Sequence, residues 1–432
     1  MSTLLLGNYE HVLHADYAHK IPVDVYRSRR TGLHVAVAKA PGPVVACNIV
    51  VPTEVETNDG LPHTLEHLVF MGSRSIPFKG ALDLMALKAM AVGGGTNAYT
   101  ELVRSLSSLF SFILLQNHTT YYVKTLGASG MRKFVRVYAD HLINPLLTPK
   151  NYASEVYHVN GDGEEAGVVY SEIQGYENDL DELVDRKMAE LVVFPSDPSF
   201  FVESVGRTRE VREMCSLKRV QDYHRHFYNL RNMWIALCGA FELEPMLREI
   251  DELDAAPEKC PPACFERPFL NAQVPELTRS RHEDVEYLYA VEVIGAYLTT
   301  TTSAPLQREI ILIEEPFADS VSLETTELPR SLITVEFSGV SLDRVDELPD
   351  KFFDVLRATT TKEALDSERI RNILQQGVKK IYASLDSDIS SVIFYGLIGH
   401  QLFADRLDDQ EQFERVMNPL PIYEELLQKP LD

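Results

Sequence analysis

Cysteine is scarce in this chain of 432 residues. The five cysteines form an odd and widely spread set, which does not indicate a disulfide framework: Cys47, Cys215, Cys238, Cys260 and Cys264. The first residues lack the basic end and long apolar stretch of a secretory signal, and they do not show the Arg-rich, acid-poor pattern of a mitochondrial presequence. We therefore expect a reducing compartment, with the cytoplasm as the default location and the mitochondrion as the alternative.

Long apolar runs are missing, and positive charge is in deficit. The most apolar stretch, residues 106–115, is interrupted by serines and is much shorter than the roughly 20 residues of a transmembrane helix. Lysine and arginine total 41 against 64 for aspartate and glutamate, a net charge of −23 that repels phosphate backbones and anionic membranes. We expect no nucleic-acid or membrane partner. Such acidity can attract basic peptides, although net charge more often serves solubility.

The remaining composition is that of a globular protein. Hydrophobic residues make up 45% and charged residues 24%, which are close to the averages for soluble domains. A chain of this length is too long for one ordinary compact domain. Residues 254–268 are rich in proline and have no sustained period, which predicts a domain boundary. We expect one unit over residues 1–258, a linker over 259–269 and a second unit over 270–432.

Strand and helix patterns alternate along the chain. Two strands are expected at 33–38 and 44–51, on either side of the turn signal Pro41-Gly42-Pro43, and further strands at 96–100, 233–238 and 332–337. Helices are expected at 61–70, 79–92, 130–142, 163–176, 180–193, 217–228 and 286–298, with helical patterns over 362–403. The alternation predicts an α+β layer structure.

The strongest chemical signal lies in residues 60–72, which read GLPHTLEHLVFMG. His63 and His67 are four residues apart and therefore share one face of a helix. Two imidazoles in this arrangement can bind one Zn²⁺, and Glu66 lies close enough to act on a metal-bound water. The segment predicts a helical zinc site with Glu66 as the catalytic base.

A catalytic zinc usually takes three protein ligands and leaves a fourth position for water. The best candidate for the third ligand is Glu172, which lies in the acidic segment 162–177. If this segment is helical, Glu165 and Glu172 lie two turns apart on the same face. We expect Glu172 to bind the metal and Glu165 to orient a ligand from behind. The alternative is an acidic helix whose side chains are simply solvated.

Three segments follow one another in the order HTLEHLVFMGS, GGGTNAYT and EEAGVVYSEIQG. Their order and spacing resemble the pitrilysin and insulysin family of zinc metallopeptidases, whose inverted motif is H-x-x-E-H. The nearest branch is that of the presequence proteases. The resemblance implies half of a clamshell made of two tandem related units, each a mixed or antiparallel sheet covered by helices on one side. In this reading residues 1–258 are the zinc-binding unit and 270–432 the non-catalytic repeat.

The resemblance also implies roles for individual residues. His63, His67 and Glu172 would bind zinc, while Glu66 takes a proton from the bound water and passes it to the leaving amine. The zinc would polarise the scissile carbonyl. Asn97 and Ala98 match the family's edge strand, which pairs with the substrate backbone and so favours extended peptides as partners.

The sequence departs from the family pattern in two places. Only the first of two halves matches, and the half expected to be absent is the one that supplies a substrate-binding arginine and tyrosine in the family. In addition, Glu101 to Gln116 form a Leu/Ser/Phe-rich insertion after GTNAYT. The pyrimidine-rich codons of this stretch resemble a retained intron, whereas a genuine insertion would displace the edge strand or gate the metal site.

Two classes of function remain open. The intact HTLEH motif and Glu172 predict a zinc-dependent endopeptidase that cleaves unstructured peptides. The absent half favours instead a catalytically incomplete half, or a non-catalytic structural or partner subunit, that needs a second chain. A two-chain enzyme resembling the mitochondrial processing peptidase is a third reading, because its catalytic chain is similarly short.

Overall fold

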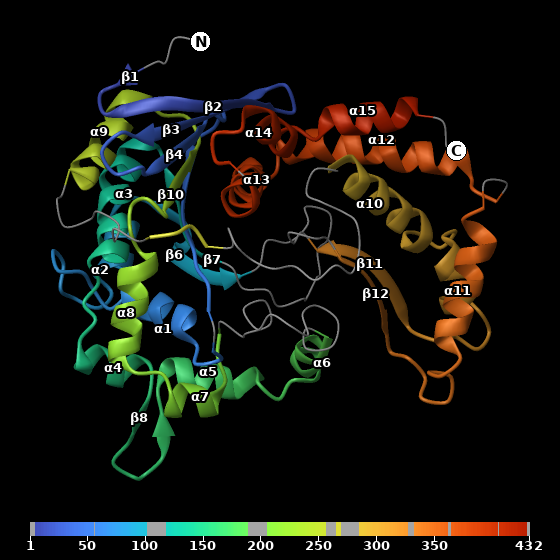
Figure 1. The fold of residues 1–432 in the computed structure, drawn as a ribbon, viewed down its shortest axis with the longest axis horizontal. Helices are drawn as coiled ribbons and strands as arrows, with labels where there is room; N and C mark the ends of the chain where they lie inside the picture. The colour runs from blue at the N-terminus through green and yellow to red at the C-terminus, as the bar shows by residue number, and fades with distance from the viewer. Residues whose placement is uncertain are drawn as a thin grey trace. The chain divides into compact units, whose positions relative to one another are not determined.

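The computed structural model describes residues 5–55, 57–101, 118–188, 205–255, 265–268, 285–326, 332–361, 364–404 and 406–429 (Figure 1). The described residues form two compact units. The first unit comprises those up to 268 together with 393–417, and the second comprises 285–392 and 418–429. The predicted insertion lies outside the described residues from position 102 onward, as does most of the predicted linker.

An eight-stranded mixed sheet forms the centre of the first unit (Figure 1). Its order is β1-β2-β3-β4-β10-β5-β7-β6. The strands are β1 (Leu5–Leu6), β2 (Tyr9–Tyr17), β3 (Ile21–Ser28), β4 (His34–Ala38), β5 (Val44–Pro52), β6 (Ala91–Glu101), β7 (His118–Leu126) and β10 (Trp234–Cys238). Only the pair β4 and β10 is parallel, and the other neighbours are antiparallel. The predicted α+β class with a mixed sheet is confirmed.

Helices cover one face of this sheet and supply the main core. Alternate strand residues such as Val35, Ile49 and Ile235 are fully buried there, as the period of two along a strand requires. The helical elements of this part are α1 (Leu61–Val69), α2 (Ala81–Lys88), α3 (Ala128–Ile143), α4 (Pro149–Glu155), α5 (Val168–Tyr176), α6 (Leu180–Met188), α7 (Thr208–Glu213), α8 (Leu217–Phe227) and α9 (Leu243–Asp254). The short hairpin of β8 (His158–Val159) and β9 (Glu165–Ala166) joins α4 to α5.

Two helices from near the end of the chain contact the opposite face of the sheet. They are α13 (Ile389–Phe403), most of which belongs to the first unit, and α14 (Gln410–Met417), which lies against β2. Ile398 and Leu402 pack on Val50, and the His400 ring meets Trp234 edge to face. Residues 393–417 were expected in the second unit, and helices were expected on one side of the sheet only. The structure differs from both predictions. Aromatic and apolar side chains on the second face of the sheet are covered by α13, which brings these residues into the first unit.

Several boundaries differ from the sequence prediction. The sheet starts earlier than expected, because β2 and β3 precede the two strands predicted first. Their polar residues hid them from a search for Val-rich and Ala-rich runs. Helix α2 ends at Lys88, since Met90 adopts a φ of 59° and the chain then enters β6. The glycines at 93–95 therefore lie within the strand, where its register against β7 shifts.

The second unit has its own apolar core. Its described elements are α10 (Val285–Thr299), the π-helical turn η4 (Gln307–Ile311), β11 (Ser320–Thr326), β12 (Leu332–Ser338), α11 (Leu348–Thr359), α12 (Ser367–Ser384) and α15 (Leu420–Gln428). The strands β11 and β12 pair only with each other among the described strands. That this unit repeats the first stays a prediction. Among the described residues, no helix combines the length and the apolar character that crossing a membrane requires.

Candidate metal centre

His63 and His67 of α1 converge with Glu172 of α5, and we call these three residues the helix cluster. The two Nε2 atoms of the histidines lie 3.1 Å apart. The Oε2 atom of Glu172 lies 3.5 Å from the His63 Nε2 and 3.2 Å from the His67 Nε2. Three potential ligand atoms from two helices therefore form a nearly equilateral triangle.

This triangle has the size that a tetrahedral zinc ion needs. Zinc binds imidazole nitrogen and carboxylate oxygen at about 2.0–2.1 Å, so two ligand atoms of a tetrahedron lie roughly 3.3 Å apart. The three observed separations, 3.1, 3.2 and 3.5 Å, bracket that value. The donor set of two imidazoles and one carboxylate is also one that zinc accepts. The helix cluster therefore fits zinc in both geometry and chemistry.

Local sequence places α1 where the cluster needs it. Gly60 caps the helix with a φ of 66°, and a Cβ there would lie 2.6 Å from the Val205 carbonyl oxygen. Pro62 then occupies the first turn, where its missing N–H costs no hydrogen bond. Leu65 and Leu68 are fully buried in the core. One face of α1 is thus anchored in the core while His63 and His67 point toward α5.

Glu155, at the end of α4, supports the cluster from behind. Its Oε1 lies 3.4 Å from the His67 Nδ1, and its Oε2 accepts a hydrogen bond of 2.8 Å from the Lys79 Nζ. Burial lowers the pKa of His67, but the neighbouring Glu155, Glu172 and Glu66 outweigh it and raise that pKa overall. A carboxylate on Nδ1 fixes the proton there and leaves Nε2 free to bind metal. Sequence reasoning missed Glu155, because no motif marks it.

Glu165 lies elsewhere. It was expected on a helix with Glu172, but it belongs to β9, and its side chain bonds to Tyr157, Tyr170 and Arg212. Helix α5 begins only at Val168, because Gly167 adopts a φ of 143° and packs against the Val156 backbone. The predicted common helix face is therefore wrong. The carboxylate that supports His67 from behind is Glu155, whereas Glu165 was expected in that role.

Glu172 faces both the cluster and an open groove. Hydrogen bonding to His63 lowers the pKa of this carboxyl, despite its partial burial. Beside it lies a shallow groove of about 520 Å³, lined by Ser154, His158, Gly167, Val168, Ser171 and Glu172. The third candidate ligand is therefore ionised and reachable from the surface.

Glu66 is half-buried on α1, next to His67 in sequence. Its charge acts on His67 and on three buried phenols behind it, Tyr121, Tyr138 and Tyr228. Burial is the main reason that the pKa values of these phenols are raised, and the charge of Glu66 adds to it. The Glu66 carboxylate therefore lies near both His67 and a group of buried phenols.

Asn97 and Ala98 lie on β6, which is the last strand of the sheet and pairs only with β7 among the described strands. Asn97 is exposed and donates a hydrogen bond to the Tyr122 hydroxyl. Its own Oδ1 accepts from the Ala98 N–H, and its carbonyl accepts from Tyr138. The predicted edge strand is thus an edge among the described strands, and the Asn97 side chain occupies the N–H of Ala98 there.

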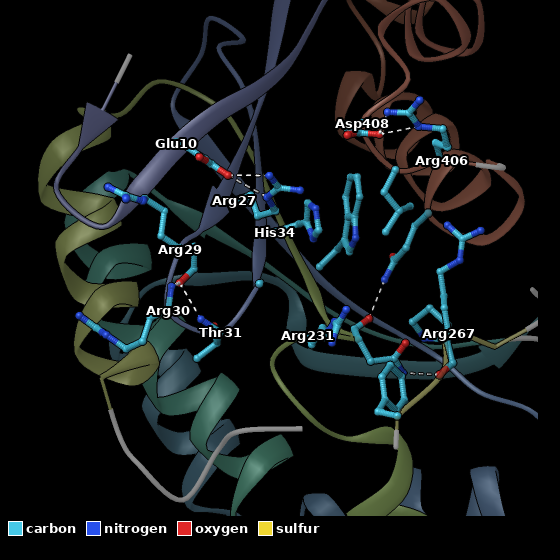
Figure 2. Close-up of a pocket in the computed structure, with 18 of the residues that line it drawn as sticks. Glu10, Arg27, Arg29, Arg30, Thr31, His34, Arg231, Arg267, Arg406 and Asp408 are labelled. Atoms are coloured by element: carbon cyan, nitrogen blue, oxygen red, sulfur yellow. Dashed lines mark hydrogen bonds and ion pairs between the residues drawn. The ribbon is translucent and has the colours of Figure 1, made fainter. Parts of the chain in front are cut away.

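A larger cavity lies on the other face of the sheet (Figure 2). Its volume is about 960 Å³, and its lining includes His34, Trp234 and six arginines, Arg27, Arg29, Arg30, Arg231, Arg267 and Arg406. Two of these arginines pair with acidic residues of the same lining, Arg27 with Glu10 and Arg406 with Asp408. The lining contains no member of the helix cluster, so this cavity is separate from the candidate centre.

Sequence relatives of this chain are longer proteins. An uncharacterised protein of Caenorhabditis elegans is 35% identical over 434 residues, which cover 95% of this chain and 42% of that protein. The mitochondrial presequence protease of Danio rerio is 25% identical over 227 residues, which cover 51% of this chain and 20% of that protein. The chain spans about two fifths of the length of the first curated relatives it matches. No family model matches the chain.

Solved structures of peptidases share the fold. The crystal structure of pitrilysin superposes with a TM-score of 0.64 at 18% identity, over 95% of this chain and 46% of that one. A peptidase M16 inactive domain from Pseudomonas fluorescens gives 0.63 at 13% identity, over 95% of both chains. The chain therefore has the fold of half an M16 peptidase. The resemblance to pitrilysin-type peptidases is confirmed at the level of the fold.

Proposed function

We propose that this chain is the metal-binding half of a zinc-dependent endopeptidase that cleaves unstructured peptides. The observation that carries the proposal is the triangle formed by His63, His67 and Glu172, with sides of 3.1 to 3.5 Å. The M16 peptidase fold agrees with it. Basic peptides suit the net charge of −23.

Each residue has a task in this proposal. His63, His67 and Glu172 would hold the ion, and Glu155 would keep the His67 Nε2 aimed at it. When bound, zinc supplies Lewis acidity that polarises the scissile carbonyl. Glu66 takes a proton from the attacking water and passes it to the leaving amine, which is the role of a general base and then a general acid.

The edge strand β6 would align the substrate. An extended peptide adds to a free strand edge through backbone hydrogen bonds, with little demand on its side chains. Asn97 and Ala98 lie at that edge, and the Ala98 N–H becomes available once the Asn97 side chain turns away. This binding mode favours unstructured peptides, because a folded protein does not offer an unpaired strand.

A second function keeps the same site without turnover by this chain alone. The chain spans about two fifths of its first curated relatives, and one neighbour of the same fold is an inactive M16 domain. On this alternative the chain binds zinc but acts as an incomplete half or a structural partner. A complementary chain would then supply the remaining substrate contacts.

The deciding experiment measures zinc content and cleavage of an unstructured, mildly basic peptide by the 432-residue chain. Wild type is compared with Glu66→Gln, with Glu244→Gln as the matched control, because Glu244 is an exposed residue of α9. We expect both variants to hold zinc at the helix cluster. Cleavage should fall by about 10²–10⁴-fold in Glu66→Gln only, the usual contribution of a general base.

The other outcomes separate the alternatives. If wild type binds zinc that His67→Ala loses, but cleaves no peptide, the incomplete half is favoured. Adding a complementary half should then produce cleavage. If the wild-type chain neither binds zinc nor cleaves the peptide, the enzymatic proposal for this chain is refuted.

A further inference from the structure

A second group of metal-binding residues lies on β2 and β3, outside the helix cluster. His11 and His14 of β2 and Asp24 of β3 have ligand atoms that lie within 4.8 Å of one another. We call these three residues the strand cluster. From them we infer a second binding site for a divalent transition-metal ion, independent of the proposed peptidase function.

A β-bulge brings the two histidines to the same side of the strand. Residues three apart on a regular strand point to opposite faces, because side chains alternate. Here the register shifts between His11 and Leu13, so that His11 pairs with Tyr26 and His14 with Asp24. The extra residue, Val12, adds one step to the alternation. Both imidazoles therefore lie on the face that carries Asp24.

One carboxylate oxygen joins the two rings. The Asp24 Oδ1 lies 2.8 Å from the His11 Nε2 and 2.9 Å from the His14 Nδ1. An ion with ligands at about 2.0–2.1 Å needs these atoms roughly 3.3 Å apart, so a movement of a few tenths of an ångström would admit it. The side chains of His11 and Asp24 are 28% and 19% exposed, and that of His14 is 46% exposed. Solvent can thus supply the remaining ligands.

The surroundings hold His14 in the required position. The Asp16 Oδ2 lies 3.7 Å from the His14 Nε2, the nitrogen that does not face Asp24. A carboxylate on that side favours the proton on Nε2 and leaves Nδ1 as a metal ligand. The backbone N–H and C=O of His14 both bond to the Gln410 amide of α14. The Gln410 side chain thereby fixes the backbone of β2 at this residue.

The ligand types select the ion. Two imidazoles and one carboxylate suit Zn²⁺, Co²⁺, Ni²⁺ or Fe²⁺, whereas Ca²⁺ and Mg²⁺ prefer oxygen ligands alone. Glu10 precedes His11 as Glu66 precedes His67, but its carboxylate accepts hydrogen bonds from Arg27, and the Asp16 carboxylate faces His14. We therefore assign the strand cluster metal binding, which would join β2 to β3, and no hydrolytic step.

The test counts bound metal in the 432-residue chain by equilibrium dialysis and by Co²⁺ absorption. We expect two equivalents in wild type, one in His14→Ala, one in His63→Ala/His67→Ala, and none when the three substitutions are combined. His226→Ala, an exposed histidine of α8 without a carboxylate partner among the described residues, is the matched control and should keep two. Asp16→Asn should weaken the strand cluster about 10-fold, the lower end for an outer-shell partner.

Two results would overturn the inference. One is a His63→Ala/His67→Ala chain that remains folded by circular dichroism and binds no metal. The other is a His14→Ala chain that binds as many equivalents as His226→Ala. If the His63→Ala/His67→Ala chain fails to fold, the comparison of wild type with His14→Ala and the affinity of Asp16→Asn decide. A failure of cleavage alone leaves these counts unaffected. If the helix cluster binds no metal, the wild type and the His63→Ala/His67→Ala chain should each hold one equivalent, and His14→Ala should hold none.

Discussion

The helix cluster and the strand cluster contain the same ligand types on different secondary structure. On α1 the spacing of four residues alone places His63 and His67 together. On β2 the spacing of three residues would separate His11 from His14, and only the bulge unites them. The helix cluster also has Glu66 beside it and a groove at Glu172. The carboxylates next to the strand cluster are engaged, Glu10 with Arg27 and Asp16 with His14.

The difference between the two clusters shows what hydrolysis requires beyond the binding of a metal ion. Two histidines and a carboxylate are enough to bind a metal ion. Hydrolysis needs in addition a base within reach and room for a substrate. The peptidase proposal for the helix cluster draws on Glu66 as the base and on the groove beside Glu172 as that room. Two histidines with one carboxylate therefore support different proposals in the two places, a catalytic centre at the helix cluster and a binding site at the strand cluster.

The largest expected effect is the loss of zinc from the helix cluster. His67→Ala removes a ligand that is also tied to Glu155, so we expect the zinc affinity to fall by more than the roughly 100-fold limit of an outer-shell change. During stepwise dialysis of wild type against a chelator, the more exposed strand cluster should lose its ion first. Release in the opposite order would reverse the ranking of the two sites.

The next effect concerns the carboxylate behind the helix cluster. Glu155→Gln leaves the His67 Nδ1 facing a neutral amide, and we expect zinc affinity to fall about 10-fold to 100-fold in competition with a chelating dye. Glu165→Gln is the matched control and should leave the affinity unchanged, because the Glu165 carboxylate contacts no histidine of the cluster. A larger loss in Glu165→Gln would restore the role that the sequence predicted.

A smaller effect tests the turn that positions Glu172. A methyl group on Gly167 would overlap the Val156 carbonyl oxygen, and its φ of 143° is unfavourable for alanine. We expect Gly167→Ala to lower the free energy of unfolding by about 1–3 kcal/mol and to weaken zinc binding, because α5 starts at the next residue. Gly163→Ala, with a φ of 84° but open space around it, should destabilise less in urea unfolding and keep the zinc affinity.

The smallest effect distinguishes the clustered histidines from buried ones. Burial lowers the pKa of His34 and of His118 to about 3 and that of His224 to about 4. The folded protein therefore keeps them neutral while the unfolded chain, with a histidine pKa near about 6.5, takes up protons. Stability should be fully present above about pH 6.5 and fall as the pH drops toward 4, by about 1.4 kcal/mol per pH unit for each histidine.

Urea unfolding between pH 7 and 4.5 checks this expectation. His34→Gln removes one buried histidine, so the free energy of unfolding should fall less steeply than in wild type, by about 1.4 kcal/mol per pH unit below about pH 6.5. His226→Ala, which replaces an exposed histidine, should leave the slope unchanged. Equal slopes in wild type and His34→Gln would show that His34 is not the neutral group that its burial requires.

Much of the helix cluster could be predicted, because helix geometry acts over four residues. Leu61–Val69 is nearly the helix expected over 61–70, and Glu172 meets the histidines as the family resemblance implied. The strands at His34–Ala38, Val44–Pro52 and Trp234–Cys238 also agree, since each is an apolar run that is buried almost throughout. Local patterns suffice wherever the signal and the structure have the same short range.

Other features depend on distant parts of the chain. Glu155 reaches His67 from 88 residues away, and no local signal marks it. Helix α13 covers Val50 and Trp234 because the second face of the sheet needs an apolar partner, which no boundary composition reveals. The position of Glu165 is decided by Gly167 and by the pairing of β8 with β9.

The sequence by itself determined the identity and spacing of His63, Glu66 and His67, since an α-helix converts a spacing of four into a shared face. It also determined the acidic charge and the apolar strands of the sheet. Only the tertiary structure decided which carboxylates meet which histidines. Glu155 and Asp24 reach their partners through strand register, a bulge and helix packing, which are long-range contacts that a reading of the chain in order does not contain.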